Sequence, residues 1–534
     1  MLRGLASRAS HLTHRGLVPT AFAATPVLRA HALHGRIGAP ALLSLSGRLG
    51  AADQPDRPLR QQQKQPVQPQ LQQSRRWRPR WRPWQQQQQQ QQQQRGYRPS
   101  QEEFDAEKSR DREYGRAPTI DEVLFTFLGT SSGAPSRTRN QQALAVQLLG
   151  TTWLFDAGEA CQHRMMDTSI TAPSISRIFI SHLHGDHVFG LPGLLCNIAM
   201  SYGGGEDGDV GVRRSRQNAA LVIVGPPGLR SFLRVAIGNA YASLGEMRLV
   251  IHELDGLEAV RRPKGARKGR PAYEVRRPLP CEAGGLDIAP DSDGVWHIPR
   301  DSPHDPPASV RAVELDHTVP TVGWVIEEDP RPGKVDMRKL RPLLNQHRVE
   351  PRRIRDLKEG RPVELPDGAV LDPADYVGAS TQRKFVVLSD MSATKRPLDG
   401  LRPLLSGATL FVHESTNAFT DEDAKGGKKT PRTVERDARR HGHSTPQMAG
   451  GVAAALDARH LVLTHFSPRY ASTDVATMDD IKCLARKQFG GNVTAAEDLM
   501  RVRVGIDGTV DVEADASFKA WRRGGRPFAT APVS

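Results

Sequence analysis

Four residues that can bind a metal ion lie within six positions of the stretch FISHLHGDHVFG, residues 179–190. They are His182, His184, Asp186 and His187. Imidazole nitrogens and carboxylate oxygens are the usual nitrogen and oxygen ligands of zinc. Chance produces such an H-x-H-x-D-H pattern in roughly one chain of this composition in a thousand. We therefore predict a metal site rather than a polar loop after a strand, and we expect further ligands from elsewhere in the chain.

Further residues of ligand type follow short apolar runs later in the sequence, where strands are expected to end. A single histidine after a strand is usually a capping or surface residue. Strand ends in layered α/β folds, however, converge on one rim, where ligand sites lie. Together with the first four, these residues suffice for two metal ions. The residues are Asp316, His317, Asp390, His413, Glu414 and His465.

The elements that must position these side chains begin near Asp121. Apolar runs of strand character alternate from there with segments of helical character, which indicates an α/β layered domain. Two interruptions, 203–216 and about 255–310, are interpreted as surface loops. The expected strands are 123–129, 144–149, 152–158, 177–184, 220–226, 248–254, 310–317, 323–328, 384–390, 409–415, 460–466 and 502–508, and the expected helices are 192–200, 228–244, 432–441, 445–458 and 477–489.

The first hundred residues lack the composition of a folded domain. Residues 1–52 contain six arginines, no lysine and no acid, which indicates an organellar transit peptide rather than an ordinary disordered tail. This presequence favours the mitochondrion and leaves the chloroplast open. Residues 53–118 include ten consecutive glutamines and predict a disordered linker, whose WRPRWRPW segment either contacts RNA or has no function. The folded domain is expected over 119–510, with a tail over 511–534.

The positive charge of the chain belongs to this N-terminal region. Residues 1–100 contain 16 basic and two acidic residues, whereas residues 101–534 contain 58 and 57. The high isoelectric point therefore does not indicate that the folded body binds nucleic acid. The four cysteines form no CxxC pair, which argues against a disulfide framework or a thiolate zinc site. No apolar stretch is long enough to span a bilayer, and no membrane partner is expected.

The motif HLHGDH resembles the signature of the metallo-β-lactamase superfamily, and the downstream motifs resemble its tRNase Z branch, particularly the short form, over about residues 121–505. This resemblance implies an αββα four-layer sandwich. It also implies two Zn²⁺ ions per subunit, with Mn²⁺ or another divalent ion as an alternative. The implied ligands are His182, His184 and His317 for one ion, Asp186, His187 and His465 for the other, and Asp390 between them.

Two loops resemble the family's HEAT and HST motifs. TLFVHESTNA contains Glu414, and RRHGHSTPQ contains His443. The resemblance implies that Glu414 holds His443 as a general acid, and that Asp186 is a partner of the attacking water as well as a ligand. His441 matches the pattern less well than His443. SDMS replaces the family's GDT and HEST replaces HEAT, but both keep the acidic residue.

Two further features favour RNA as the substrate. GAPSRTRNQQ resembles the family's PxKxRN loop, with Pro135, Arg137, Arg139 and Asn140 aligned and arginine in place of lysine. Residues 331–361 contain 11 basic and four acidic residues and resemble the flexible arm that grips tRNA in this branch, inserted at about 329–380. Cations in such an arm contact phosphates. The expected contacts are Lys334, Arg338, Lys339, Arg352, Arg353 and Lys358.

The leading hypothesis is a zinc endoribonuclease that removes 3′ trailers from precursor tRNA after the discriminator nucleotide. The resemblance also implies a homodimer. A second hypothesis keeps the metals but assigns a small ester as substrate, in a phosphodiesterase or other hydrolase of this fold. A third is an RNA-binding scaffold that has lost its chemistry, against which the complete ligand set argues.

Overall fold

The computed structural model describes residues 115–202, 220–257, 277–300, 305–392 and 400–513. The expected transit peptide, nearly all of the linker, most of the tail and the 203–216 interruption therefore lie outside the described residues. The chain divides into units 1–79 and 80–534, and all described residues belong to the second. Among the described residues, no helix is long and apolar enough to cross a membrane.

The first sheet has nine strands in the order β18-β17-β1-β2-β3-β4-β5-β6-β7. Neighbours are antiparallel from β18 to β3 and parallel from β3 to β7. Since β18 continues past residue 510 and pairs with β17, the predicted domain end at 510 is too early. The strands are β1 Val123–Gly129, β2 Ala143–Leu148, β3 Thr151–Phe155, β4 Ile175–Phe179, β5 Leu221–Gly225, β6 Leu249–Leu254, β7 Asp287–Ile288, β17 Arg501–Val504 and β18 Val510–Glu513.

The second sheet has seven strands in the order β16-β15-β14-β13-β10-β9-β8. Neighbours are antiparallel from β8 to β13 and parallel from β13 to β16. β8 lies in the 255–310 stretch, so the prediction of a continuous surface loop there is wrong: β8 pairs with β9 and buries Trp296 between the sheets. The strands are β8 Val295–Ile298, β9 Ala308–Glu314, β10 Val322–Glu328, β13 Lys384–Val387, β14 Leu410–Glu414, β15 His460–Thr464 and β16 Asn492–Ala495.

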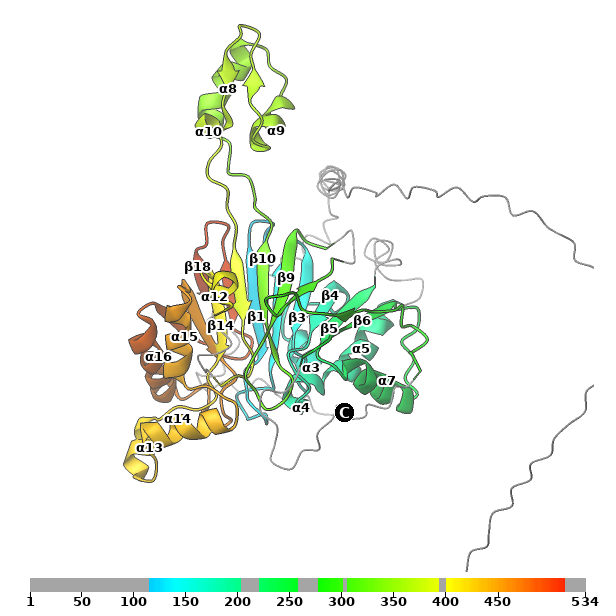
Figure 1. Cartoon of the computed structure of the whole chain (residues 1–534), viewed down its shortest axis with the longest axis vertical. Helices are drawn as coiled ribbons and strands as arrows, with labels where there is room; N and C mark the ends of the chain where they lie inside the picture. Colours follow the sequence, from blue (N-terminus) through cyan, green and yellow to red (C-terminus); the bar gives the residue numbers. More distant parts are fainter. Residues whose placement is uncertain (1–114, 203–219, 258–276, 301–304, 393–399, 514–534) are drawn as a thin grey trace, which may run out of the picture. The chain divides into compact units, whose positions relative to one another are not determined.

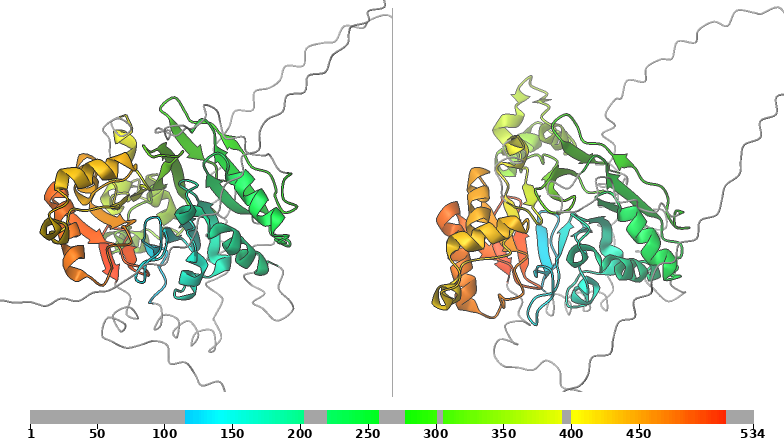
Figure 2. Two further views of the ribbon diagram at one scale, coloured as in Figure 1. Left: turned by 90° about the horizontal axis from the view of Figure 1, so that it is seen from below. Right: turned by 60° about the horizontal axis from the view of Figure 1, so that its bottom comes forward.

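Successive side chains of a strand point to opposite sides of its sheet. One face of each sheet packs against the other sheet and the opposite face packs against helices, so both faces are buried. In β1, Phe125 and Phe127 pack between the sheets, whereas Leu128 faces the outer helices. Helices α3, α5 and α7 cover the first sheet and α12, α15 and α16 the second (Figures 1 and 2). The expected αββα sandwich is thus confirmed. The helices are α3 Cys161–Met166, α5 Leu191–Met200, α7 Leu229–Asn239, α12 Arg402–Leu405, α15 Pro446–Ala455 and α16 Val475–Phe489.

The insertion expected at about 329–380 has a hydrophobic core of its own. Isolated bridges join Arg331 to Thr381 and Val335 to Val377 and close its base. Figure 1 shows its helices grouped beyond two extended segments. Its elements are α8 Met337–Gln346, α9 Arg353–Lys358, β11 Val363–Glu364, β12 Val370–Leu371 and α10 Pro373–Tyr376, and its core residues are Leu340, Leu344, Leu357, Val363, Leu365 and Leu371.

Candidate metal centre

The strand ends of both sheets deliver the predicted ligands to one place. Asp390 and His465 follow the parallel strands β13 and β15, whose carboxyl ends lie at the same edge. His182 follows β4, and the backbone N–H of Val322 at the start of β10 donates to the carbonyl of neighbouring Ser181, 3.0 Å away. This bond joins the sheets beside the site. His184 precedes the short helix α4, Gly185–Val188, which carries Asp186 and His187.

Four ligand atoms from both sheets form a compact group. His184 Nδ1 lies 3.1 Å from His182 Nε2 and 3.3 Å from His317 Nε2. Asp390 Oδ2 lies 3.7 and 3.8 Å from the same two Nε2 atoms. The edge of a tetrahedron of zinc ligands is about 3.3 Å for Zn–N distances near 2.05 Å. The spacing of these four atoms therefore fits one tetrahedral ion.

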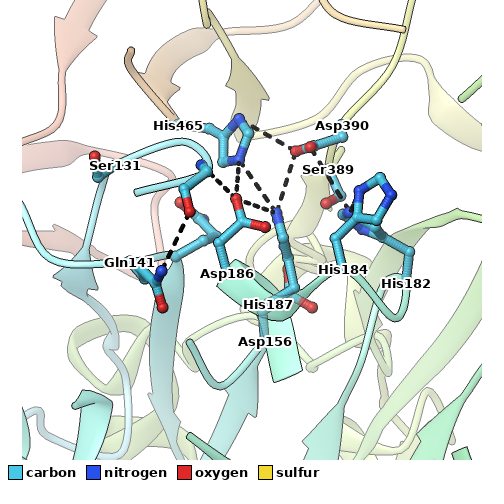
Figure 3. Close-up of polar contacts among 12 residues, drawn as sticks. Ser131, Gln141, Asp156, His182, His184, Asp186, His187, Ser389, Asp390 and His465 are labelled. Atoms are coloured by element: carbon cyan, nitrogen blue, oxygen red, sulfur yellow. Dashed lines mark hydrogen bonds and ion pairs between the residues drawn. The ribbon is translucent and has the colours of Figure 1, made fainter. Parts of the chain in front are cut away.

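A second group lies against the other oxygen of Asp390. His187 Nε2 and His465 Nε2 are 3.1 Å apart, and Asp186 Oδ2 is 3.6 and 3.3 Å from them. Asp390 Oδ1 lies 3.5 Å from His187 Nε2 and 3.2 Å from His465 Nδ1. Figure 3 shows these side chains converging from both sides of Asp390. The structure thus brings the seven predicted residues together, and a further possible group joins Asp390 and His465 to His443.

The polar chemistry of the cluster fits bound cations. Asp390 Oδ1 is buried and has no hydrogen-bond partner, which is costly for a carboxylate unless a positive charge lies beside it. Burial acts to raise the pKa of Asp390, but His465 and His187 hold it well below its usual range. Asp390 is therefore an anion between two sets of nitrogen and oxygen ligands.

Hydrogen bonds on the outer ring nitrogens fix how the histidines face the centre. His317 Nδ1 donates to the carbonyl of Gly442 at 2.8 Å, and His187 Nδ1 lies 2.7 Å from Asp156 Oδ2. Each bond directs the Nε2 atom of its ring toward the centre. Asp156 also accepts from the N–H and hydroxyl of Ser181, at 2.7 and 2.9 Å.

Sequence reasoning missed Asp156 although it follows the expected strand TWLF as the other ligands follow theirs. Its φ of 59° is a second sign that the strand exit is constrained. Gly133 was also missed: its N–H donates to Asp186 Oδ2 at 2.6 Å and orients that carboxylate. No pattern in the sequence indicates this contact.

Burial keeps several of the imidazoles neutral. It lowers the pKa of His182 well below its usual range, lowers that of His184, and lowers that of His317 to about 4. Neutral imidazole is the form that binds metal. In His187, burial also opposes protonation, but Asp390 and Asp156 outweigh it and raise the pKa well above its usual range. A proton on Nδ1 facing Asp156 is compatible with a metal at Nε2.

Glu414 and His443 form a pair beside the cluster. Glu414 Oε1 lies 3.2 Å from His443 Nδ1 and accepts from the N–H of Met391 at 2.8 Å, while its Oε2 accepts from the hydroxyl of Thr416 at 2.6 Å. Burial opposes a proton on His443, but the Glu414 and Asp390 carboxylates outweigh it and raise the pKa of His443 to about 9. His443 is therefore a protonated imidazole whose Nε2 is left to donate.

His441 does not share this position. It is exposed, and its Nδ1 lies 2.8 Å from the carbonyl of Asp437 in its own helix. His413, another residue singled out after a strand, is fully buried, and its Nδ1 lies 2.7 Å from the carbonyl of Glu414. Neither histidine belongs to the residue groups that could hold a metal.

Comparisons with known proteins identify the family. A family model described as "Anti-Pycsar protein Apyc1" matches residues 123–205. Human "Zinc phosphodiesterase ELAC protein 1" is 35% identical over 394 residues, covering 71% of this chain and 98% of that protein. "Ribonuclease Z" of Trichodesmium erythraeum is 32% identical over 386 residues, covering 72% and 95%. The chain belongs to the ribonuclease Z family.

Among solved structures, human tRNase Z, short form, is 29% identical with a TM-score of 0.42, and it covers 71% of this chain and 98% of that chain. The human and Trichodesmium erythraeum relatives confirm the predicted resemblance, and the grouped histidines and carboxylates support the prediction of a metal-binding site in this ribonuclease Z chain.

In this ribonuclease Z, the loop predicted to contact RNA contributes fewer exposed residues than expected. Pro135 and Arg137 are exposed. Arg139 is fully buried, and its guanidinium donates to Tyr470 O at 2.9 Å and to Ala496 O at 2.8 Å. The prediction of an RNA contact for Arg139 is therefore wrong, because its donors are committed inside the protein. Asn140 is partly buried and donates through its side chain to Glu159 O at 2.9 Å.

The six cations predicted to contact RNA in the inserted arm are all exposed. Arg352 pairs with Glu350, and Arg353 pairs with Asp356 at 2.9 Å. The cations are Lys334, Arg338, Lys339, Arg352, Arg353 and Lys358.

Proposed function

We propose that this protein is an endoribonuclease that removes 3′ trailers from precursor tRNA. It cuts after the discriminator nucleotide and leaves a 3′-hydroxyl on the tRNA and a 5′-phosphate on the trailer. The observation that carries this proposal is the Glu414–His443 pair, 3.2 Å apart, beside a complete set of metal ligands. The names of the relatives, a ribonuclease and a phosphodiesterase, support phosphodiester cleavage.

We propose that the centre holds two divalent ions, zinc in the first instance. One would be held by His182, His184 and His317 and the other by Asp186, His187 and His465, with Asp390 contacting both. When bound, such ions lower the pKa of a water molecule and stabilise negative charge on the phosphate.

Residues of the chain then have separate roles in the reaction. Asp186, held by the N–H of Gly133, orients the attacking water. Attack forms a bond from the water oxygen to phosphorus and breaks the bond from phosphorus to the 3′ oxygen. The leaving oxygen keeps the electron pair and takes a proton from His443 Nε2, since Nδ1 is occupied by Glu414. One proton of the water stays on the phosphate monoester, and the other passes to solvent, from which His443 is protonated again.

The test compares two substrates and a variant without the arm. Because Arg331 and Thr381 close its base, residues 332–380 are replaced by a short Gly-Ser linker in the full chain. We expect this variant to lose cleavage of a 3′-extended precursor tRNA but to keep turnover of bis(p-nitrophenyl) phosphate. Equal loss of both activities by an intact variant, or no cleavage near the discriminator by the metal-loaded parent, contradicts the proposal.

We also propose that the protein is a homodimer located in mitochondria. The location is inferred from the arginine-rich, acid-free residues 1–52, and the dimer from the family resemblance. Imaging of a fusion of residues 1–100 to a fluorescent protein tests the location, and sedimentation analysis tests the dimer.

A further inference from the structure

A basic helical hairpin leads directly to the loop that bears His443. It consists of α13, Asp421–Gly426, and α14, Pro431–Arg440. Residues 425–440 contain seven basic and two acidic residues. This hairpin is distinct from the arm at 329–380, and its charge has no part in the functions assigned so far.

The cations of α14 occupy one side of the helix. Val434 and Ala438 are its buried residues. Arg432, Arg436 and Arg440 are exposed and, at a spacing of four residues, lie on the opposite side about 6 Å apart along the axis. Together with Lys428, which is exposed in the preceding turn, they are called the α14 row below.

The end of α14 is tied to the candidate centre. The N–H of His443 donates to Ala438 O at 2.9 Å, and Gly442 has a left-handed φ of 78°, which is the pattern of a glycine helix cap. The Gly442 carbonyl accepts from His317 Nδ1. A Cβ at Gly442 would lie 2.6 Å from that nitrogen. The helix therefore ends at a fixed place beside both histidines.

The cations of the α14 row are not explained by a contribution to the stability of the helix. Arg440 is in the last turn, where a cation is favourable, but Lys428 and Arg432 are at the N-terminal end, where the helix dipole opposes positive charge. Among the described residues, no carboxylate pairs with Lys428, Arg432 or Arg440, whereas Arg439 pairs with Glu435 at 2.9 Å. An external anion would satisfy this arrangement.

We propose that the α14 row binds backbone phosphates of the tRNA acceptor stem, on the 5′ side of the cleaved bond. This inference rests on the proposed function. His443 protonates the leaving 3′ oxygen, which belongs to the tRNA body. Since the attacking water approaches in line from the opposite side of phosphorus, the acid and the helix attached to it lie toward the tRNA rather than toward the trailer.

The test uses the full, metal-loaded protein with Lys428→Gln, Arg432→Gln and Arg440→Gln combined. A matched control replaces three exposed cations of the α12 and α16 segments, Arg402→Gln, Arg486→Gln and Lys487→Gln. Each lost phosphate contact reduces the slope of log affinity against log salt by about 0.7 to 0.9. With three cations removed, we expect a slope smaller by about two to three, and a KM for precursor tRNA raised about 10- to 100-fold at 0.1 M salt.

Three comparisons locate the contact. The effect is expected with a minihelix that contains only the acceptor stem, and it is expected to be equal for trailers of one and of many nucleotides. Turnover of bis(p-nitrophenyl) phosphate is expected to stay at the parent level. An unchanged KM, a loss equal to that of the control, or an effect confined to long trailers overturns the inference. Failure of the parent itself to cut precursor tRNA refutes the proposed function instead.

Discussion

Replacing Glu414 with glutamine tests the assignment of His443 as the acid. The change keeps the size of the side chain but removes the charge that lies 3.2 Å from His443 Nδ1. Because Glu414 is the first of the groups that raise the pKa of His443, its loss moves that pKa downward. The protonated imidazole is the active form, so activity is then lost at lower pH.

The magnitude follows from the rise of the His443 pKa from 6.5 to about 9. A rise of that size corresponds to about 3 kcal/mol. Cations beside Asp390 offset part of this rise in pKa. In the variant, the midpoint of the alkaline limb of the activity profile is therefore expected to shift to lower pH by about one to two units. At pH 8, the protonated fraction of His443 and with it the cleavage of precursor tRNA are then expected to drop about 2- to 10-fold.

The assay is the pH dependence of kcat/KM for two substrates. p-Nitrophenolate leaves without a proton, so bis(p-nitrophenyl) phosphate turnover is expected to be insensitive to Glu414→Gln and to His443→Ala. His443→Ala is expected to lower precursor tRNA cleavage about 10²- to 10⁴-fold and to abolish the limb. An alkaline limb that stays in place in Glu414→Gln, or an equal loss on both substrates, refutes the assignment.

Three other predictions concern buried charges. Asp156→Asn removes the partner of His187 and is expected to weaken zinc binding about 10- to 100-fold, as measured by competition with a chelator; unchanged affinity contradicts the orienting role of Asp156. Arg383→Met leaves its buried ion-pair partner Glu328 with Arg331, 2.9 Å away, as its remaining cation and is expected to cost up to about 3 kcal/mol in urea unfolding, part of which Glu328→Gln in the same chain restores. Burial raises the pKa of Asp498 from 3.8 to about 6, so the folded protein binds a proton that the unfolded chain has released. The stability contributed by this proton is lost as pH rises from about 4 through about 6, by about 3 kcal/mol; Asp498→Asn is expected to remove this dependence from urea midpoints measured over that range.

The sequence predicted the framework well because strands buried on both faces leave long apolar runs. All twelve expected strands correspond to strands of the structure. β8 was missed because its four residues lie in a Pro- and Arg-rich stretch, and pairing with β9, rather than local composition, makes it a strand. Short helices such as α3 lack enough residues to show a period.

The sequence does not show which residues near the site are buried, and this limited the prediction of the site. The metal ligands were found because their spacing and positions after strands are local properties. The motif that aligned Arg139 gives its position in the loop but not its depth, and only the tertiary structure shows its donors turned inward. Asp156 presented the opposite difficulty, since a single aspartate after a strand is common.

The two sheets contribute unequal and separate parts of the centre, and this has a consequence for how the protein matures. His182, His184, Asp186 and His187 follow the first sheet, whereas His317, Asp390 and His465 come from strands of the second, 278 residues separating His187 from His465. During synthesis, the first group is complete once Asp390 has been made, whereas the group that includes His465 is complete only when nearly the whole domain has left the ribosome. An ion bound by ligands from both sheets would hold the sheets together, and free metal would stabilise the folded state by mass action. With metal bound at this centre, its supply would act on the lifetime of the folded protein as well as on its activity.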